Sequence, residues 1–175
     1  MDNASIDGLF RRMYTALVES LERGEGGPFA ASVVVNGRAV SIGTNTVIRS
    51  FDVSRHAEIN ALAEAGRRLE RCHLHEAVLL TTHYPCLMCY NALKWAGIPT
   101  AYYLFDYEET ERLFGFSGDS RLLKDLSLTS DTLDADPSVD MIRYRSPLTD
   151  RLFAESLVRR WREEFEPECE DYDIV

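Results

Sequence analysis

Hydrophobic residues recur three and four positions apart from Ile6 to Leu21, and the glycine-rich stretch Gly24–Gly27 then ends the pattern. Two short β-prone runs follow, Ala30–Val35 and Arg38–Ile42. They are joined by Asn36-Gly37, a dipeptide that accepts the positive φ angles of a two-residue hairpin turn. The pattern therefore predicts one amphipathic helix followed by an antiparallel pair of strands.

The middle of the chain alternates between helical and strand-like segments. Helical spacing returns over Arg55–Leu69, and an apolar strand is expected at Ala77–Thr81. A helix should run from about Cys86 to Gly97, because Pro85 comes just before it and proline is favoured at or just before the first turn of a helix. Ala101–Phe105 then forms an aromatic strand. Strand, helix and strand in this order predict a βαβ unit with parallel strands, and hence an α/β fold.

The last third of the chain is more polar and less regular. We expect two short helices at Glu108–Phe114 and Asp119–Leu126, a polar loop at Ser127–Pro137, an edge strand at Val139–Tyr144, and a final helix at Leu148–Phe165. The acidic tail Glu166–Val175 follows. We interpret residues 1–175 as a single domain whose C-terminal helix and tail, about residues 148–175, close the active site.

Composition and charge narrow the possible functions. The chain has 175 residues, 45% of them hydrophobic, which is ordinary globular composition. A formal net charge of −10 disfavours nucleic acid as a partner, and the denser basic groups, at Arg67-Arg68 and Arg159-Arg160, fit solvated helix faces. No apolar run approaches the length of a membrane span, and the N-terminus lacks the pattern of a secretion signal. These features predict a cytoplasmic protein without membrane partners.

Two motifs place metal-ligand residues at the starts of two predicted helices. His56-Ala57-Glu58 opens one helix, and Pro85-Cys86-Leu87-Met88-Cys89 opens another. Two thiolates three positions apart can share one ion, and the positive end of the helix dipole favours their ionised form. His56, Cys86 and Cys89 therefore predict one Zn²⁺ per chain. Three protein ligands are typical of catalytic zinc, which keeps a position for water, although a structural or redox cysteine pair is the alternative.

Glu58 stands two residues beyond the histidine and can reach that water without binding the metal. A carboxylate in this position can take a proton from the water and deliver it to a substrate nitrogen and a leaving amine. His-x-Glu followed by Pro-Cys-x-x-Cys is the signature of zinc deaminases. The sequence thus predicts hydrolytic deamination, in which zinc hydroxide attacks an amine-bearing ring carbon and ammonia leaves.

Across residues 5–165 the chain resembles the cytidine deaminase superfamily, and within it the bacterial guanine deaminases. The resemblance rests on the two zinc motifs and on further segments, which in chain order are Gly26-Gly27-Pro28-Phe29-Ala30, Gly43-Thr44-Asn45-Thr46-Val47, Trp95-Ala96, Tyr102-Tyr103, Gly115-Phe116 and Asp119-Ser120. It implies a three-layer α/β/α sandwich around a mixed five-stranded sheet.

The resemblance also implies roles for residues outside the zinc motifs. Asn45 should bond one face of a base, Phe29 and Trp95 should line or stack on it, and the Ala57 N–H should meet a carbonyl oxygen. Family members of this type are homodimers, some of which exchange a C-terminal segment that closes the partner's site. Candidates for the acidic or aromatic group that binds the exocyclic amine lie late in the chain. They are the carboxylates of Asp119, Asp171 and Asp173 and the aromatic Tyr172.

The chain departs from guanine deaminases at two places, and these leave the substrate open. His83-Tyr84 stands where Cys-Glu is usual, and Ser117-Gly118-Asp119 stands where a paired Asp-Asp is usual. Thr81-Thr82 and the terminal Tyr172-Asp173-Ile174 look instead like fungal-type cytosine deaminases. We therefore keep a free nucleobase, guanine first, as the leading hypothesis. Cytosine, a nucleoside or another heterocycle is the alternative, and an RNA-binding or tRNA adenosine-editing protein is the alternative from another class.

Overall fold

A computed structural model describes residues 1–126 and 138–165 of the chain. The predicted polar loop at 127–137 and the acidic tail at 166–175, which includes Tyr172 and Asp173, lie outside the described residues. Five strands form one sheet: β1 (Ala30–Val35), β2 (Arg38–Thr44), β3 (Ala77–His83), β4 (Thr100–Phe105) and β5 (Asp140–Arg143).

The order of the strands in the sheet is β2-β1-β3-β4-β5. Strand β1 runs antiparallel to β2 and β3, whereas β4 is parallel to β3 and β5. Asn36 and Gly37 adopt φ angles of 51° and 73°, as the predicted hairpin turn requires. The mixed five-stranded sheet, its opening hairpin, its parallel βαβ unit and its edge strand are all confirmed.

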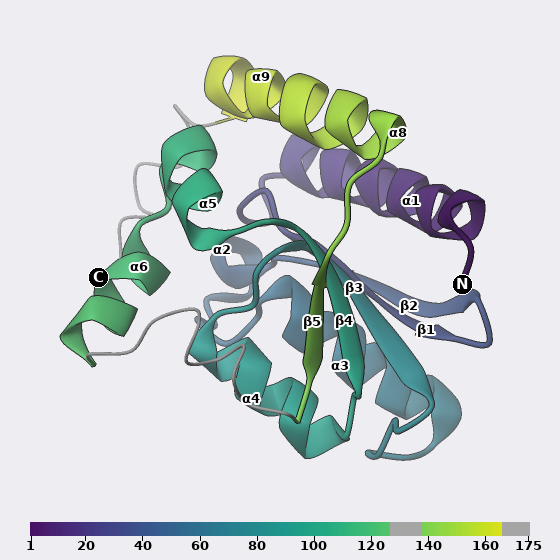
Figure 1. Ribbon diagram of the computed structural model, residues 1–175. Coiled ribbons are helices and arrows are strands. Elements are labelled where there is room, and N and C mark those ends of the chain that lie inside the picture. The colour runs from purple at the N-terminus through teal and green to yellow at the C-terminus, as the bar shows by residue number, and fades with distance from the viewer. Residues whose placement is uncertain (127–137, 166–175) are drawn as a thin grey trace.

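One face of the sheet is covered by the N-terminal helix and by the C-terminal helical segment, which lie side by side in Figure 1. These are α1 (Asn3–Glu22) and the consecutive turns α8 (Pro147–Thr149), η1 (Asp150–Leu157), α9 (Val158–Arg160) and η2 (Trp161–Phe165), of which η1 and η2 are π-helical. Phe10, Leu17, Phe153 and Trp161 are buried in the core that these helices form with the sheet.

The other face of the sheet is covered by α3 (Ala57–Leu69) and α4 (Leu87–Ala96), so the three-layer arrangement is confirmed (Figure 1). Helix α3 lies very close to β2 at one point. A Cβ atom on Gly43 would lie 2.5 Å from Ala57 O and 2.5 Å from Ala61 N, a separation that real Cβ atoms do not tolerate. Glycine at position 43 therefore lets the helix that follows His56 pack directly on the strand.

Three short helices lie around one end of the sheet: α2 (Val47–Ser50), α5 (Tyr107–Phe114) and α6 (Gly118–Asp125). The hydrophobic pattern does not predict α2, because four residues make barely one turn. Helix α5 begins with a capping box between Asp106 and Glu109, which fixes the point where the chain leaves β4.

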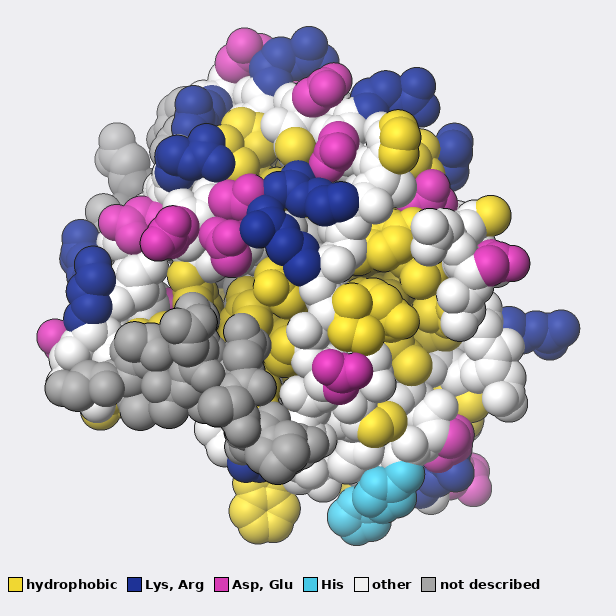
Figure 2. All heavy atoms as spheres, in the orientation of Figure 1, with side chains coloured by type: hydrophobic (Ala, Val, Ile, Leu, Met, Phe, Trp, Pro, Cys, Tyr) yellow, Lys and Arg dark blue, Asp and Glu magenta, His cyan; other side chains and the backbone are white. Residues whose placement is uncertain are grey.

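Charged side chains of both signs alternate over the upper part of the face shown in Figure 2. The described residues include several ion pairs, among them Arg143 with Asp106 and Glu109, and Arg145 with Glu109 and Asp150. Acidic partners therefore offset the positive charge that Arg143 and Arg145 could offer to a phosphate backbone. None of the described helices is both long enough and apolar enough to cross a membrane.

Candidate metal centre and its pocket

The predicted ligands meet where β3 ends and where α3 and α4 begin. His56 is the N-cap residue of α3, and Cys86 is the N-cap residue of α4 with Cys89 on its first turn. The Cys86 Sγ atom accepts a hydrogen bond from the Cys89 backbone N–H at 3.4 Å. Unpaired backbone N–H groups and the positive dipole ends of two helices thus converge on the two thiols, which favours negative charge there.

The three side chains fit a single zinc ion. Cys86 Sγ lies 3.5 Å from His56 Nδ1, and the ligand atoms of His56, Cys86 and Cys89 all lie within 4.8 Å of one another. Two ligands at ordinary Zn–S and Zn–N lengths on a tetrahedral ion are roughly 3.6 Å apart, so the observed spacing needs little adjustment. The set combines one imidazole with two thiols, ligands that zinc prefers over hard cations.

The hydrogen bond between the two thiols shifts their pKa values in opposite directions. A hydrogen bond from Cys89, together with the contact to His56, lowers the pKa of the Cys86 thiol. The same hydrogen bond and burial raise the pKa of Cys89 well above its ordinary value. A divalent cation bound between them stabilises both thiolates, since a coordinating thiol is deprotonated. The donor chemistry therefore suits an ion with a double positive charge.

Glu58 lies beside these ligands and is not one of them. It is 6% exposed, and its Oε1 atom accepts a hydrogen bond of 2.9 Å from the Thr81 hydroxyl. Burial raises the pKa of its carboxyl group. One carboxylate oxygen is thus held by a strand residue, which fixes the orientation of the side chain predicted to act as the acid–base group.

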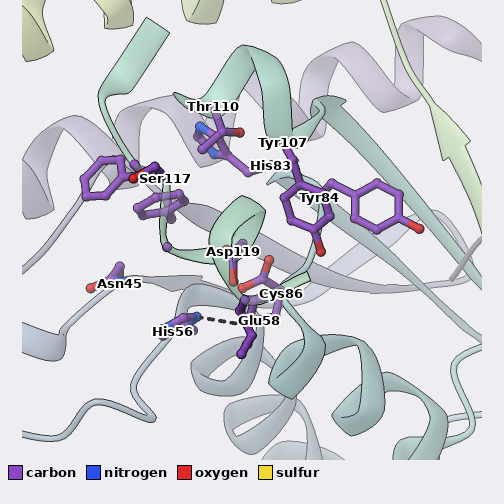
Figure 3. Close-up of a pocket in the computed structure, with 14 residues that line it drawn as sticks. Asn45, His56, Glu58, His83, Tyr84, Cys86, Tyr107, Thr110, Ser117 and Asp119 are labelled. Carbon is purple, nitrogen blue, oxygen red and sulfur yellow. Dashed lines mark hydrogen bonds between the residues drawn. The ribbon is translucent and has the colours of Figure 1, made fainter. Parts of the chain in front are cut away.

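A cavity of about 340 Å³ opens over the metal ligands (Figure 3). This volume is near the lower end of the range for small-molecule sites, roughly 300–1,000 Å³. The lining includes His56, Glu58 and Cys86, and also two residues assigned from the resemblance, Asn45 and Phe29. Two of the metal ligands, Glu58 and some of the residues expected to bind a base therefore share one small pocket.

Aromatic rings form one wall of this pocket. The Phe29 ring lies 4.9 Å from Phe116 and 4.5 Å from the His83 imidazole, measured between centroids. Phe116 in turn lies 5.5 Å from Trp161 of the C-terminal segment, whose indole N–H donates to Phe114 O at 3.0 Å. The described part of the C-terminal helix thus supports the pocket wall through Trp161.

Asn45 lines the pocket, whereas Ala57 is not among the residues that line it. Asn45 is 3% exposed, and its Oδ1 accepts a hydrogen bond of 3.1 Å from Val47 N–H, which orients the side-chain amide. A Cβ atom on Gly26 would collide with Asn45, so glycine there allows the two segments to touch. Ala57 is the fully buried first residue of α3, where backbone N–H groups have no partner within the helix.

Asp119 also lines the pocket, from the first turn of α6 (Figure 3). Burial, reinforced by the nearby Cys86 thiolate, raises the pKa of its carboxyl group to about 7. Asp119 is therefore the late acidic candidate that the described structure brings to the site. Asp171, Tyr172 and Asp173, the other candidates, lie outside the described residues.

Trp95 does not line this pocket, contrary to the expectation from the resemblance. Its side chain is 83% exposed on α4, and it borders a separate groove between α3 and α4. At about 100° per residue, Trp95 lies about 200° around the helix from the buried Leu93. The face of α4 that carries Leu93 packs on the sheet, so Trp95 points outward.

The structure adds pocket residues that the sequence analysis did not single out, Tyr107, Thr110 and Leu122 among them. The Tyr107 hydroxyl donates to Pro85 O at 2.6 Å, which supports the turn that carries Cys86. These residues come from α5 and α6, well beyond the second zinc motif in the chain. The spacing of the sequence motifs does not predict that these residues lie near the metal ligands. Their position follows from the path of the chain after β4.

Residues 5–105 match the family described as the cytidine and deoxycytidylate deaminase zinc-binding region. The guanine deaminase of Bacillus subtilis (strain 168) is 33% identical over 116 residues, which are 66% of this chain and 73% of the relative. A tRNA-specific adenosine deaminase of Agrobacterium fabrum is 37% identical over 93 residues, covering 52% of this chain and 61% of the relative.

Solved structures give a similar result. A guanine deaminase from Nitrosomonas europaea superimposes with a TM-score of 0.67 at 25% identity, covering 86% of this chain and 80% of the other. The Bacillus subtilis guanine deaminase superimposes with a TM-score of 0.64 at 27% identity, covering 93% and 94% of the two chains. The likeness to these structures therefore extends well beyond the zinc motifs.

Proposed function

Because this chain belongs to the zinc-binding cytidine and deoxycytidylate deaminase family, and is therefore a deaminase, we propose that its substrate is a free nucleobase or a related amino-heterocycle, guanine first. The observation that carries this proposal is the small cavity of about 340 Å³ whose lining includes two of the metal ligands, His56 and Cys86, together with Glu58 and Asn45. A cavity of this size suits one ring system better than a polymer.

A zinc ion held by His56, Cys86 and Cys89 would supply Lewis-acid activation of water. Glu58 accepts a proton from the attacking water and delivers it to the ring nitrogen beside the amine-bearing carbon. A second proton passes through the same carboxylate to the departing amine. A carbon–oxygen bond forms, the carbon–nitrogen bond breaks, and ammonia leaves. The hydrogen bond from Thr81 holds Glu58 in place through both transfers.

The remaining residues bind and orient the ring. Asn45 bonds one edge of the heterocycle, Phe29 packs on its face, and the Ala57 N–H bonds a carbonyl oxygen. Asp119 binds the exocyclic amine, a role that the position of this carboxyl group in the pocket supports. The rings of Phe29 and Phe116 restrict access of water to the reacting carbon.

We also propose that the protein is a homodimer and that its C-terminal tail, with Tyr172 and Asp173, closes an active site, in its own chain or in the partner. The exposed Trp95 borders an apolar groove between α3 and α4, which supports burial of that face against a second copy. The contact of Trp161 with Phe116 brings the last described helical turn against the pocket wall, which supports a role for the residues that follow it in the chain.

Cytosine, a nucleoside or another heterocycle is the alternative substrate, and tRNA is the alternative from another class, because tRNA-specific adenosine deaminases are among the relatives. The net charge of −10 and the paired arginines at Arg143 and Arg145 favour a small molecule over a polyanion.

Ammonia release by the zinc-loaded protein tests the proposal. The panel contains guanine, adenine, cytosine, the corresponding nucleosides and transfer RNA, with Glu58→Gln as the matched inactive control. The proposal predicts release from a free base with the highest kcat/KM for guanine. Faster release from a nucleoside or from tRNA than from every free base would reject it.

A further inference from the structure

One polar atom beside the pocket has no hydrogen-bond partner. His83, the last residue of β3, is 3% exposed, and its Nε2 is the single buried side-chain nitrogen or oxygen without a partner among the residues that the structure describes. Buried polar atoms in folded proteins are almost always paired, and an orphan is costly to keep. Because His83 lines the pocket, this unpaired atom suggests that a bound substrate supplies its hydrogen-bond partner.

The hydrogen bonds around Thr82 indicate what Nε2 presents to that partner. The Thr82 hydroxyl oxygen accepts from Ala30 N–H at 3.0 Å, lies 3.3 Å from Ala30 O, and lies 2.9 Å from His83 Nδ1. All three contacts are satisfied when Thr82 donates to Ala30 O and Nδ1–H donates to Thr82. This arrangement leaves Nε2 without a proton, as a hydrogen-bond acceptor.

The surroundings of the imidazole keep it in this state. The rings of Phe29, Phe105 and Phe114 lie 4.5, 5.2 and 4.9 Å from its centroid and offer no conventional hydrogen-bond donor. Burial among them lowers the pKa of His83 to about 3, so the ring is neutral at ordinary pH. Phe29 is only partly buried, and both Phe29 and His83 line the pocket.

The metal ligands and His83 lie in different parts of the pocket. In Figure 3, His56, Glu58, Cys86 and Asp119 gather in the lower part of the view, and His83 lies above them beside Thr110. A heterocycle whose amine-bearing carbon faces the metal ligands therefore directs its opposite edge toward His83.

We propose that His83 is a specificity-determining residue whose Nε2 accepts a hydrogen bond from a ring N–H on the substrate edge remote from the amine-bearing carbon. The inference rests on the proposed function and deepens it. A free base carries such an N–H, whereas a nucleoside carries its sugar on a ring nitrogen of that edge. His83 thus selects free bases against ribosides by a hydrogen bond that only the free base can make.

Two pairs of probes and two variants test this role. The probes are guanine with 9-methylguanine, and cytosine with 1-methylcytosine, because each methyl group removes the N–H in question. His83→Leu removes the acceptor with a similar volume, and His83→Gln keeps an acceptor near the position of Nε2. Zinc content, melting temperature, kcat, KM and the ligand-induced shift in melting temperature are measured for each protein.

We expect His83→Leu to lose about 10- to 100-fold in kcat/KM on the free base, mainly through KM, and much less on its methylated analogue. The preference for the free base then falls by about tenfold or more, and His83→Gln restores part of it. Zinc content stays at the wild-type value, and the melting temperature of the unliganded protein changes little, since loss of the hydrogen bond between Nδ1 and Thr82 is offset by removal of the unpaired Nε2.

An unchanged preference in His83→Leu overturns the inference, and so does a clear fall in its unliganded melting temperature, which would make the imidazole a structural residue. Failure of the proposed function looks different. In that case the wild-type protein releases no ammonia from either base. The ligand-induced shift in melting temperature still tests the role of His83. If His83 binds the free base, the base raises the melting temperature of the wild type more than that of His83→Leu.

Discussion

The hydrogen bonds and ion pairs of Glu25 can be tested for their contribution to the stability of the segments that form the pocket. Its side chain is 6% exposed and accepts hydrogen bonds from Ser20 Oγ at 2.8 Å and Arg23 Nε at 2.9 Å, and it also pairs with Arg49. The Arg49 backbone N–H donates to Glu25 O at 3.1 Å. Glu25 therefore ties the end of α1 to α2, on either side of the segments that carry Phe29 and Asn45.

The magnitude follows from the pKa of this carboxyl group. The hydrogen bond from Arg23, assisted by Ser20 and Arg49, lowers the pKa of Glu25 from 4.5 to about 2. That difference corresponds to at most about 3 kcal/mol of folding free energy at pH 7. The side chains of Arg23 and Arg49 are 53% and 66% exposed, so solvent screening reduces the expected value to about 1–2 kcal/mol.

The sign of the pH dependence follows from the lowered pKa. The stabilisation is fully present above the unfolded-state pKa of about 4.5 and is lost as pH falls through the folded-state value of about 2. Urea unfolding of the wild type, Glu25→Gln and the exposed control Glu111→Gln should therefore be compared at pH 7 and pH 3.5. We expect Glu25→Gln to be less stable by about 1–2 kcal/mol at pH 7, with about half of that difference gone at pH 3.5. Equal stability at pH 7, or a difference that does not shrink on acidification, would refute this role of the Glu25 cluster.

Three further predictions concern the metal, the helix contact and the tail. The double variant Cys86→Ser/Cys89→Ser should purify with almost no zinc by metal analysis and with a lower melting temperature, and a full complement of zinc would rule out the assigned ligands. Gly43→Ala should lower the free energy of unfolding by about 2 kcal/mol or more, because its Cβ would lie 2.5 Å from Ala61 N. If the variant is as stable as the wild type, α3 can move away from β2 at little cost. Truncation before Glu166 should lower kcat/KM at least about tenfold on the preferred base with zinc retained, whereas unchanged kinetics would leave the tail without a role in the site.

The fold and the metal centre follow from local signals in the sequence. Asn36-Gly37 predicts the hairpin because few other dipeptides accept two positive φ angles, and both angles are indeed positive. The zinc ligands sit at the first turns of two helices, and helix starts carry strong local signals such as proline and capping residues. Cys86 is the N-cap residue of its helix, as that reasoning requires.

The pocket wall could not be predicted in the same way. Tyr107, Thr110 and Phe116 reach the site through the path of the chain after β4, which no periodicity encodes. The orphan Nε2 of His83 becomes visible only once its neighbours are in place. Trp95 is the opposite case, because the phase of α4 relative to Leu93 already places it on the outer face.

The central claim is that the zinc ligands and Glu58 direct water to an amine-bearing carbon of a free base. Mass spectrometry of guanine incubated with the zinc-loaded protein in oxygen-18 water tests this claim most directly. We expect a product in which one oxygen-18 atom replaces the amine, formed by the wild type and at least about 100-fold more slowly by Glu58→Gln with the same zinc content. Unchanged guanine, or labelled product formed equally fast by both proteins, would contradict it.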